Sequence, residues 1–205
     1  MPAAAFPAIA QWKHPPQRRS IGARLNIGAR LEGGIMILGL SFAVFTTIHV
    51  YLSLIAILAG FVVLYGLCNG LPMPGVTAFF LATTILTSVT GFPIPPFGFD
   101  PPRAIGVISL IVLAICVFAI YGRKLSGAWR WIYVVTALVA LYLNTAVGVI
   151  QSFQKIPALN ALAPTQSNEP AFVIVQAALL LFFVFAGWVA VRRFHNAPVL
   201  VGAPA

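Results

Sequence analysis

His49 is the one Lys, Arg, His, Asp or Glu that lies well inside an apolar run of this 205-residue chain. An ionisable group in a membrane is costly to bury without a partner, which makes His49 a candidate functional residue. Its imidazole could ligate haem iron, hydrogen-bond a quinone carbonyl or relay protons. The structural alternative is a neutral imidazole hydrogen-bonded to a neighbouring helix, with Thr46 or Ser53 nearby. One His supplies one axial ligand, so bis-His haem would need a dimer and mono-His haem another ligand.

Hydroxyl and amide side chains form two further patterns at helical spacing. Thr83, Thr87 and Thr90 are spaced i, i+4, i+7 and share one helix face. A second stripe, of small and polar residues, comprises Thr136, Ala140, Asn144, Gly148 and Gln151. Either stripe could line a polar path or a ligand site. Helix packing is the favoured interpretation, because such residues let helices approach and hydrogen-bond across, at about 0.6–2 kcal/mol each.

Asn144 is the most unusual member of these stripes, because a primary amide in lipid needs hydrogen-bond partners. We expect it to face the bundle interior, toward the threonine stripe or Gln176. If the bundle encloses a pocket, the residues expected to line it are His49, Thr87, Asn144 and Gln176. Its cofactor would then be haem or a quinone, with His49 as the contact.

Other kinds of site find little support in the sequence. The three acids, Glu32, Asp100 and Glu169, all fall outside the apolar runs, whereas ion-coupled transport usually relies on buried carboxylates. Cys68 and Cys116 form no metal-ligand spacing, so we expect no metal site. No catalytic triad or phosphate-binding glycine loop is present, and we predict no catalytic residue and favour a non-enzymatic protein.

Composition places the chain in a lipid environment. Hydrophobic residues make up 60% of it and charged residues 7%, against roughly 25% charged in soluble domains. The net charge of +9 does not indicate nucleic-acid binding. The basic residues lie in the first 35 positions and in short breaks between apolar runs, where basic residues normally flank membrane spans.

The apolar runs predict an all-α fold, a polytopic transmembrane helix bundle of about five spans. The expected spans cover residues 40–67, 76–92, 103–121, 128–152 and 170–191. Two connections stand out. Residues 93–102 are too rich in proline for a helix, and residues 153–169 form the longest internal loop.

Around the bundle at 36–193, we expect a basic N-terminal leader at 1–35 and a short tail at 194–205. The leader is interpreted as a mobile cytoplasmic segment or as an over-called start, with the true start at Met36. A twin-arginine or organellar signal fits it less well. Counted from Met36, the two sides of the bundle hold two and five Lys or Arg, which favours a core with its N-terminus outside and its C-terminus inside.

Several stretches of the chain carry a resemblance to known sequences. They are Leu86–Phe92, Gly127–Ala137, Gln151–Lys155 and Ala163–Ser167. On these residues, most of 40–193 resembles an uncharacterised family of small multipass proteins of the bacterial inner membrane. The resemblance implies that membrane as the location, and it implies no activity, cofactor or substrate.

Three functions remain open from the sequence. The leading hypothesis is an accessory, assembly or scaffold component that contacts a membrane-protein partner or a second copy of itself in the bilayer. The second is a haem- or quinone-associated redox protein that uses His49. The third is a passive channel or carrier for a small neutral solute, built on the Thr and Asn stripes.

Overall fold

The computed structural model describes residues 36–94, 101–165 and 169–195. The predicted leader at 1–35, and the tail from residue 196 on, lie outside the described residues. The chain divides into two compact units, Met1–Ser41 and Phe42–Ala205.

In the first unit, the described residues form a short antiparallel hairpin of β1 (Met36–Ile37) and β2 (Leu40–Ser41). Its two central residues, Leu38 and Gly39, have φ values of 53° and 80°. Two positive φ values in a two-residue loop are typical of a type I′ turn, whose twist matches that of the strands. The apolar run that starts at Met36 therefore enters a helix only at Phe42.

In the second unit, the described residues include five helices that are long and apolar enough to cross a membrane, which confirms the predicted all-α transmembrane bundle. They are α2 (Phe42–Cys68), α3 (Pro74–Gly91), α4 (Pro101–Val117) with its π-helical continuation η1 (Phe118–Gly122), α5 (Trp129–Lys155) and α7 (Pro170–His195). Every helix end lies within four residues of the predicted span. The predicted loop at 153–169 differs, because it contains a short helix, α6 (Pro157–Leu162).

α2 and α3 form an antiparallel helical hairpin. Gly70 follows α2 with φ of 67°, and the Leu71 N–H donates to the Gly66 carbonyl over 2.8 Å. The Gly70 N–H donates to the Leu67 carbonyl, which completes a Schellman motif and satisfies the last carbonyls of the helix. Pro74 then begins α3, where its missing N–H leaves no bond unmade.

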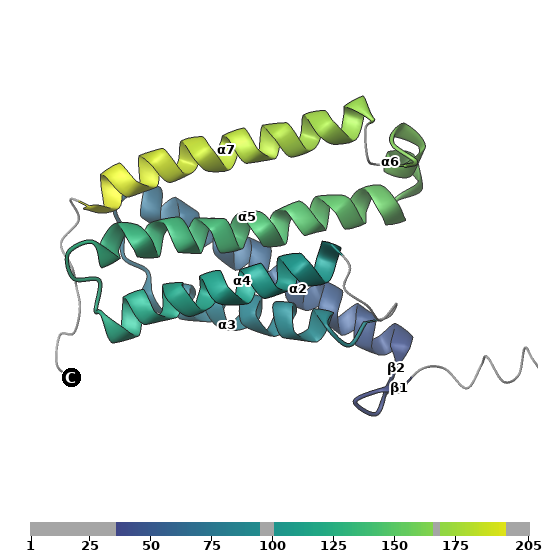
Figure 1. Ribbon diagram of the computed structural model, residues 1–205, viewed down its shortest axis with the longest axis horizontal. Helices are drawn as coiled ribbons and strands as arrows, with labels where there is room; N and C mark the ends of the chain where they lie inside the picture. The colour runs from purple at the N-terminus through teal and green to yellow at the C-terminus, as the bar shows by residue number, and fades with distance from the viewer. Residues whose placement is uncertain (1–35, 95–100, 166–168, 196–205) are drawn as a thin grey trace, which may run out of the picture. The chain divides into compact units, whose positions relative to one another are not determined.

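α5 is the central helix of the bundle and packs against α2, α4 and α7 (Figure 1). Small side chains make the tightest contacts between these helices. Those with no exposed surface are Ala56, Cys116, Ala119, Ala140 and Ala190. Because small residues let helix backbones approach closely, they supply the dispersion contacts that hold helices together in lipid.

The outer surface of the bundle is apolar as well. Leu58 on α2 is 67% exposed, and Leu181 and Phe185 on α7 are 68% and 64% exposed. A water-soluble monomer rarely exposes so large a continuous apolar surface. The chain is a multipass membrane protein, and such side chains suit the apolar interior of a bilayer.

Gly60 allows the closest contact among α2, α3 and α5. A Cβ at this position would overlap Leu141 Cδ1 and lie 2.8 Å from Phe80 Cε2. Both neighbours are about 1% exposed and have no free space to move into. Gly60→Ala should therefore lower the unfolding temperature of the protein in mild detergent, since overpacking typically costs about 1–3 kcal/mol.

Gly75→Ala is the matched control, because a Cβ there meets nothing within 4 Å. Gly75 lies in α3, where Ala is a better helix former than Gly. This variant should unfold at the wild-type temperature or above it. Equal unfolding temperatures for the two variants would contradict the packing assigned to Gly60.

Candidate functional site

The candidate site is built around His49, on α2 one to two turns from the start of the helix. The ring is half-buried, and its Nδ1 lies 2.8 Å from the Thr90 hydroxyl on α3. A Cβ added at Gly91 would lie 3.6 Å from His49 Cε1, an ordinary van der Waals distance, so the end of α3 lies close to the ring. The imidazole is thus held in the interface between α2 and α3.

The partners of Thr90 indicate which ring nitrogen carries the hydrogen. Thr90 Oγ1 lies 2.7 Å from the carbonyl oxygen of Leu86, one turn earlier, which is the usual acceptor for a threonine hydroxyl within a helix. A hydroxyl has one hydrogen, so donation to Leu86 leaves its lone pairs for His49. We therefore assign the neutral ring with N–H at Nδ1. The lone pair of Nε2 has no hydrogen-bond partner among the described residues.

The hairpin of α2 and α3 explains why Thr90 is the partner. His49 lies 21 residues before Gly70, and Thr90 lies 20 residues after it. In an antiparallel helical hairpin, residues at equal distances from the turn face each other. The alternative predicted from the sequence was a bond to a neighbouring helix, with Thr46 or Ser53 of the same helix nearby. Ser53 instead donates to the His49 backbone carbonyl over 2.9 Å.

The threonine stripe of α3 faces the interior, as its spacing predicts. Thr83 and Thr87 are buried, and Thr90 is half-buried. Thr83 donates to the Phe79 carbonyl over 2.8 Å, so its hydroxyl is satisfied within its own helix. Thr87 Oγ1 is buried and has no hydrogen-bond partner among the described residues. The Thr83 and Thr90 hydroxyls donate to carbonyls of their own helix and so offer no hydrogen to a solute, which favours packing over a solute path at these two positions.

Asn144 and Gln176 belong to another part of the bundle. Gln176 Nε2 on α7 donates to the Ala146 carbonyl on α5 over 3.3 Å. Asn144, also on α5, is half-buried, and its Nδ2 makes no hydrogen bond to the described residues. The interface between α5 and α7 is thus bridged by an amide, as that between α2 and α3 is bridged by an imidazole. No hydrogen bond links His49 or Thr87 to Asn144 or Gln176 in the described residues.

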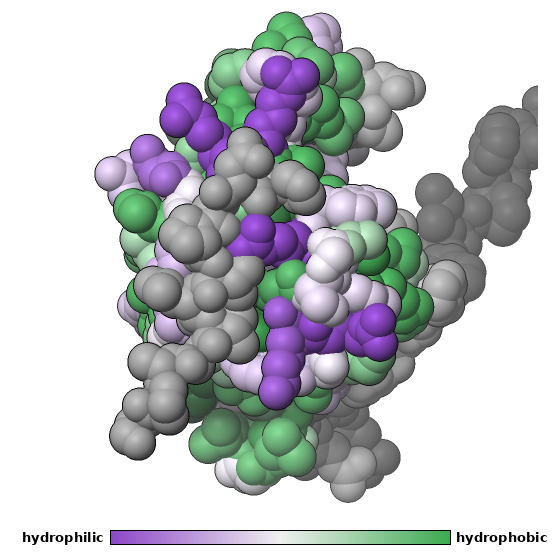
Figure 2. All heavy atoms as spheres, turned by 90° about the vertical axis from the view of Figure 1, so that its left-hand side faces the viewer, coloured by the Kyte–Doolittle hydropathy of each residue, from purple (hydrophilic) through white to green (hydrophobic). Residues whose placement is uncertain are grey.

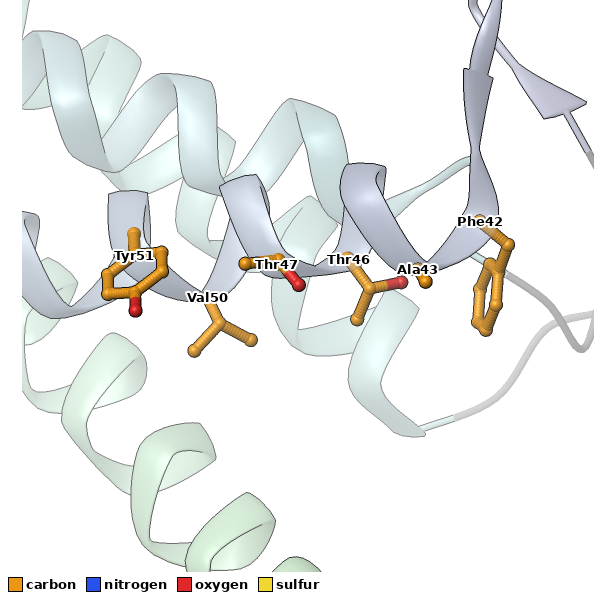
Figure 3. Close-up of a pocket in the computed structure, with 6 residues that line it drawn as sticks. All are labelled: Phe42, Ala43, Thr46, Thr47, Val50 and Tyr51. Atoms are coloured by element: carbon orange, nitrogen blue, oxygen red, sulfur yellow. The ribbon is translucent and has the colours of Figure 1, made fainter.

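An open groove of about 460 Å³ lies along the first turns of α2. Figure 3 shows its side chains along one side of that helix; they are Phe42, Ala43, Thr46, Thr47, Val50 and Tyr51. Ligand pockets of this size usually enclose most of their ligand. A groove lined by a single helix cannot do so, and none of the four predicted pocket residues lines it.

No protein-family model, curated protein or solved structure matches the chain. Among the described residues there is also no group of three or more His, Cys, Asp or Glu that could hold a metal ion. The candidate site therefore rests on the geometry of His49 and Thr90.

Thr90→Val tests that geometry. Valine has nearly the shape of threonine but cannot accept the His49 N–H, so the ring loses its partner between helices. Hydrogen bonds of this kind contribute about 0.6–2 kcal/mol in membranes. We expect a lower unfolding temperature in mild detergent, and a change in the ¹⁵N chemical shifts of the His49 ring.

Thr47→Val is the control, because Thr47 is exposed on α2 and makes no hydrogen bond to a described residue. The same chemical change should leave both readouts as in the wild type. If Thr90→Val also left the ring shifts unchanged, the assigned bond would be wrong.

Proposed function

We propose that the protein is a non-enzymatic accessory, assembly or scaffold component of the bacterial inner membrane that works through helix contacts in the bilayer. The partner is an apolar transmembrane helix, from another membrane protein or from a second copy of this chain. The observation that carries the proposal is an exposed seam along α7.

The seam follows one face of α7 at alternating intervals of four and three residues. Its members are Ile174, Ala178, Leu181, Phe185 and Trp188, all exposed. A spacing that averages 3.5 residues keeps one face toward a partner helix in left-handed packing. Ala178 provides a small position between larger ones, which is where a neighbouring helix can approach.

α7 is also the span least occupied by contacts within its own chain. In the most apolar window of each span, 11% of α7 is buried, against 33% of α2, α3 and α5. Its buried residues lie in the second half of the helix and include Phe183, Ala186 and Ala190. From Pro170 to Leu179 no described side chain is buried. Most of α7 therefore remains available to another molecule within the membrane.

The proposed location and orientation rest on the sequence resemblance and on charge. In the described part of the bundle, the end that holds the α4–α5 turn carries five basic side chains, and the other end carries two, Arg103 and Lys155. Basic residues concentrate on the inner side of bacterial membranes. We accordingly assign the start of α2 to the outside and the end of α7 to the inside.

A redox-associated role is the second candidate, and the orientation of His49 favours it. With N–H at Nδ1, the Nε2 lone pair can accept a hydrogen bond from a hydroquinone hydroxyl or ligate haem iron. The test compares absorbance spectra before and after dithionite for wild type and His49→Ala, purified from native membranes. A Soret band that shifts on reduction and is lost in the variant supports haem; equal spectra and equal extracted quinone in both proteins exclude this role.

Photo-crosslinking in native membranes tests the leading proposal. A benzophenone side chain in place of Leu181 should give one dominant crosslinked product, because a partner helix lies against the seam. The mass of the product identifies the partner as another protein or as a second copy. The double variant Leu181→Ala, Phe185→Ala should reduce co-purification of that partner in mild detergent.

Leu58 and Tyr65 on α2 provide matched controls. Leu58 is 67% exposed, like Leu181 at 68%, and Tyr65 is 62% exposed, like Phe185 at 64%. A crosslinker at Leu58 should give no dominant protein product, and Leu58→Ala, Tyr65→Ala should leave co-purification unchanged. Crosslinks to lipid alone from Leu181 would count decisively against an accessory role through α7.

A further inference from the structure

The groove on α2 opens where this helix leaves its neighbour α7. Phe61 of α2 packs against Phe182 and Phe183 of α7, with ring centroids 6.4 and 6.1 Å away. Toward its start α2 diverges from α7 (Figure 1). Val50 and Thr47, about three and four turns before Phe61 on the same face, are exposed. The groove of about 460 Å³ therefore lies along a face of α2 that α7 no longer covers.

Two exposed hydroxyl side chains line this groove. Thr47 and Tyr51 lie one turn apart, and Figure 3 shows them on the same side of α2. Thr47 is exposed and Tyr51 is 63% exposed, and neither makes a hydrogen bond within the part of the chain that the structure describes. Ser53 on the same helix differs, because it donates to the His49 carbonyl. The groove therefore presents two hydroxyl groups that can donate to another molecule.

Both residues belong to the part of α2 that lies in the membrane. The 27 residues of α2 extend about 40 Å, and the hydrocarbon layer is about 30 Å thick, so a centred helix extends about 5 Å beyond the layer at each end. Figure 2 shows hydrophilic side chains on the end of the bundle opposite the groove, as expected where helices reach water. Thr47 and Tyr51 follow Phe42 by about 8 and 14 Å along the helix. They therefore lie inside the hydrocarbon layer, near one of its surfaces.

A hydroxyl group in hydrocarbon is costly to leave without a hydrogen-bond partner, and lipid chains offer none. Side chains of an α-helix lean toward its N-terminus, so both hydroxyls are directed toward the nearer membrane surface. The acceptors at that level of a bilayer are the ester carbonyls of glycerolipids, which lie where the hydrocarbon layer begins. None of the six residues that line the groove is charged, so their chemistry selects the ester region rather than a headgroup.

We infer that the groove binds a glycerolipid through its ester carbonyls, with Thr47 and Tyr51 as donors and the first part of an acyl chain against Val50. Leu54, one turn further along α2 and 51% exposed, continues the apolar surface for that chain. A groove lined by one helix suits such a ligand, because the surrounding lipid covers its other side. The inference does not depend on the accessory role proposed above, because it concerns α2 rather than the seam on α7.

Competition between two lipids tests the inference on the full chain. Each protein is freed of lipid in mild detergent and given equal amounts of a diacyl phosphatidylcholine and its dialkyl ether analogue, which has the same chain length but no carbonyls. Native mass spectrometry then measures the ratio of the two bound lipids. Wild type should favour the ester lipid. Thr47→Val and Tyr51→Phe should each reduce that preference about three-fold or more, which is the effect of one hydrogen bond in a membrane.

Tyr65→Phe is the matched control. Tyr65 is 62% exposed on the same helix, but it lies outside the groove and three residues before the end of α2, at the level where a helix reaches water. Tyr65→Phe should retain the wild-type preference. Thr47→Ser should retain it too, because serine keeps the hydroxyl.

Three results would overturn the inference. The first is equal binding of the ester and ether lipids by wild type. The second is an unchanged preference in the double variant Thr47→Val, Tyr51→Phe, which is the result expected if a helix of another protein filled the groove. The third is a loss of preference in Tyr65→Phe as large as that in Tyr51→Phe.

Discussion

Inside the hydrocarbon layer, a polar group of the backbone must find its hydrogen-bond partner within the protein, because no water is present to replace it. In the described spans the backbone forms continuous helix, so its N–H and C=O groups bond to one another within each span. Several hydroxyl side chains follow it as well, since Thr83, Thr84 and Ser88 each donate to a carbonyl of their own helix, whereas the buried Thr87 hydroxyl has no partner among the described residues. At the exit of α2, the bonds to the Gly66 and Leu67 carbonyls close the last turn. The bundle therefore has few polar groups left over with which to do chemistry.

Once the backbone is satisfied, side-chain size determines how the helices pack. In the interior, small side chains such as Ala140 and Ala190 pack beside large ones such as Phe80, and leucine and phenylalanine also extend from the outer surface of α2 and α7. A water-soluble bundle places its large apolar side chains inside. In lipid the large side chains gain nothing by burial, and close approach of the backbones provides the attraction. The same rule makes the seam on α7 a surface on which a further helix can pack.

The side chains that could bind a ligand therefore lie near the ends of the helices. His49 lies near one end of α2, where α3 supplies Thr90, and basic side chains lie at the ends of α4 and α7 and at the start of α5. Between these two levels, the polar contacts bridge neighbouring helices, as Gln176 bridges α7 and α5. Such contacts specify which helices are neighbours. They are consistent with a protein that acts through helix contacts in the bilayer.

The sequence by itself determined the number, length and apolar character of the spans, because the thickness of a bilayer sets the length of a helix and hydropathy is a property of each residue. It also identified His49 and Asn144 as side chains in need of partners, and Gln176 as a group that Asn144 could face. Only the tertiary structure decided which partners they have. The helical hairpin brings Thr90 to His49 from 41 residues away, and packing of α7 on α5 places Gln176 against Ala146. The hairpin at Met36–Ser41 and the short helix α6 were likewise missed, since turn geometry in an apolar run, and a helix of six residues, leave no periodic signal.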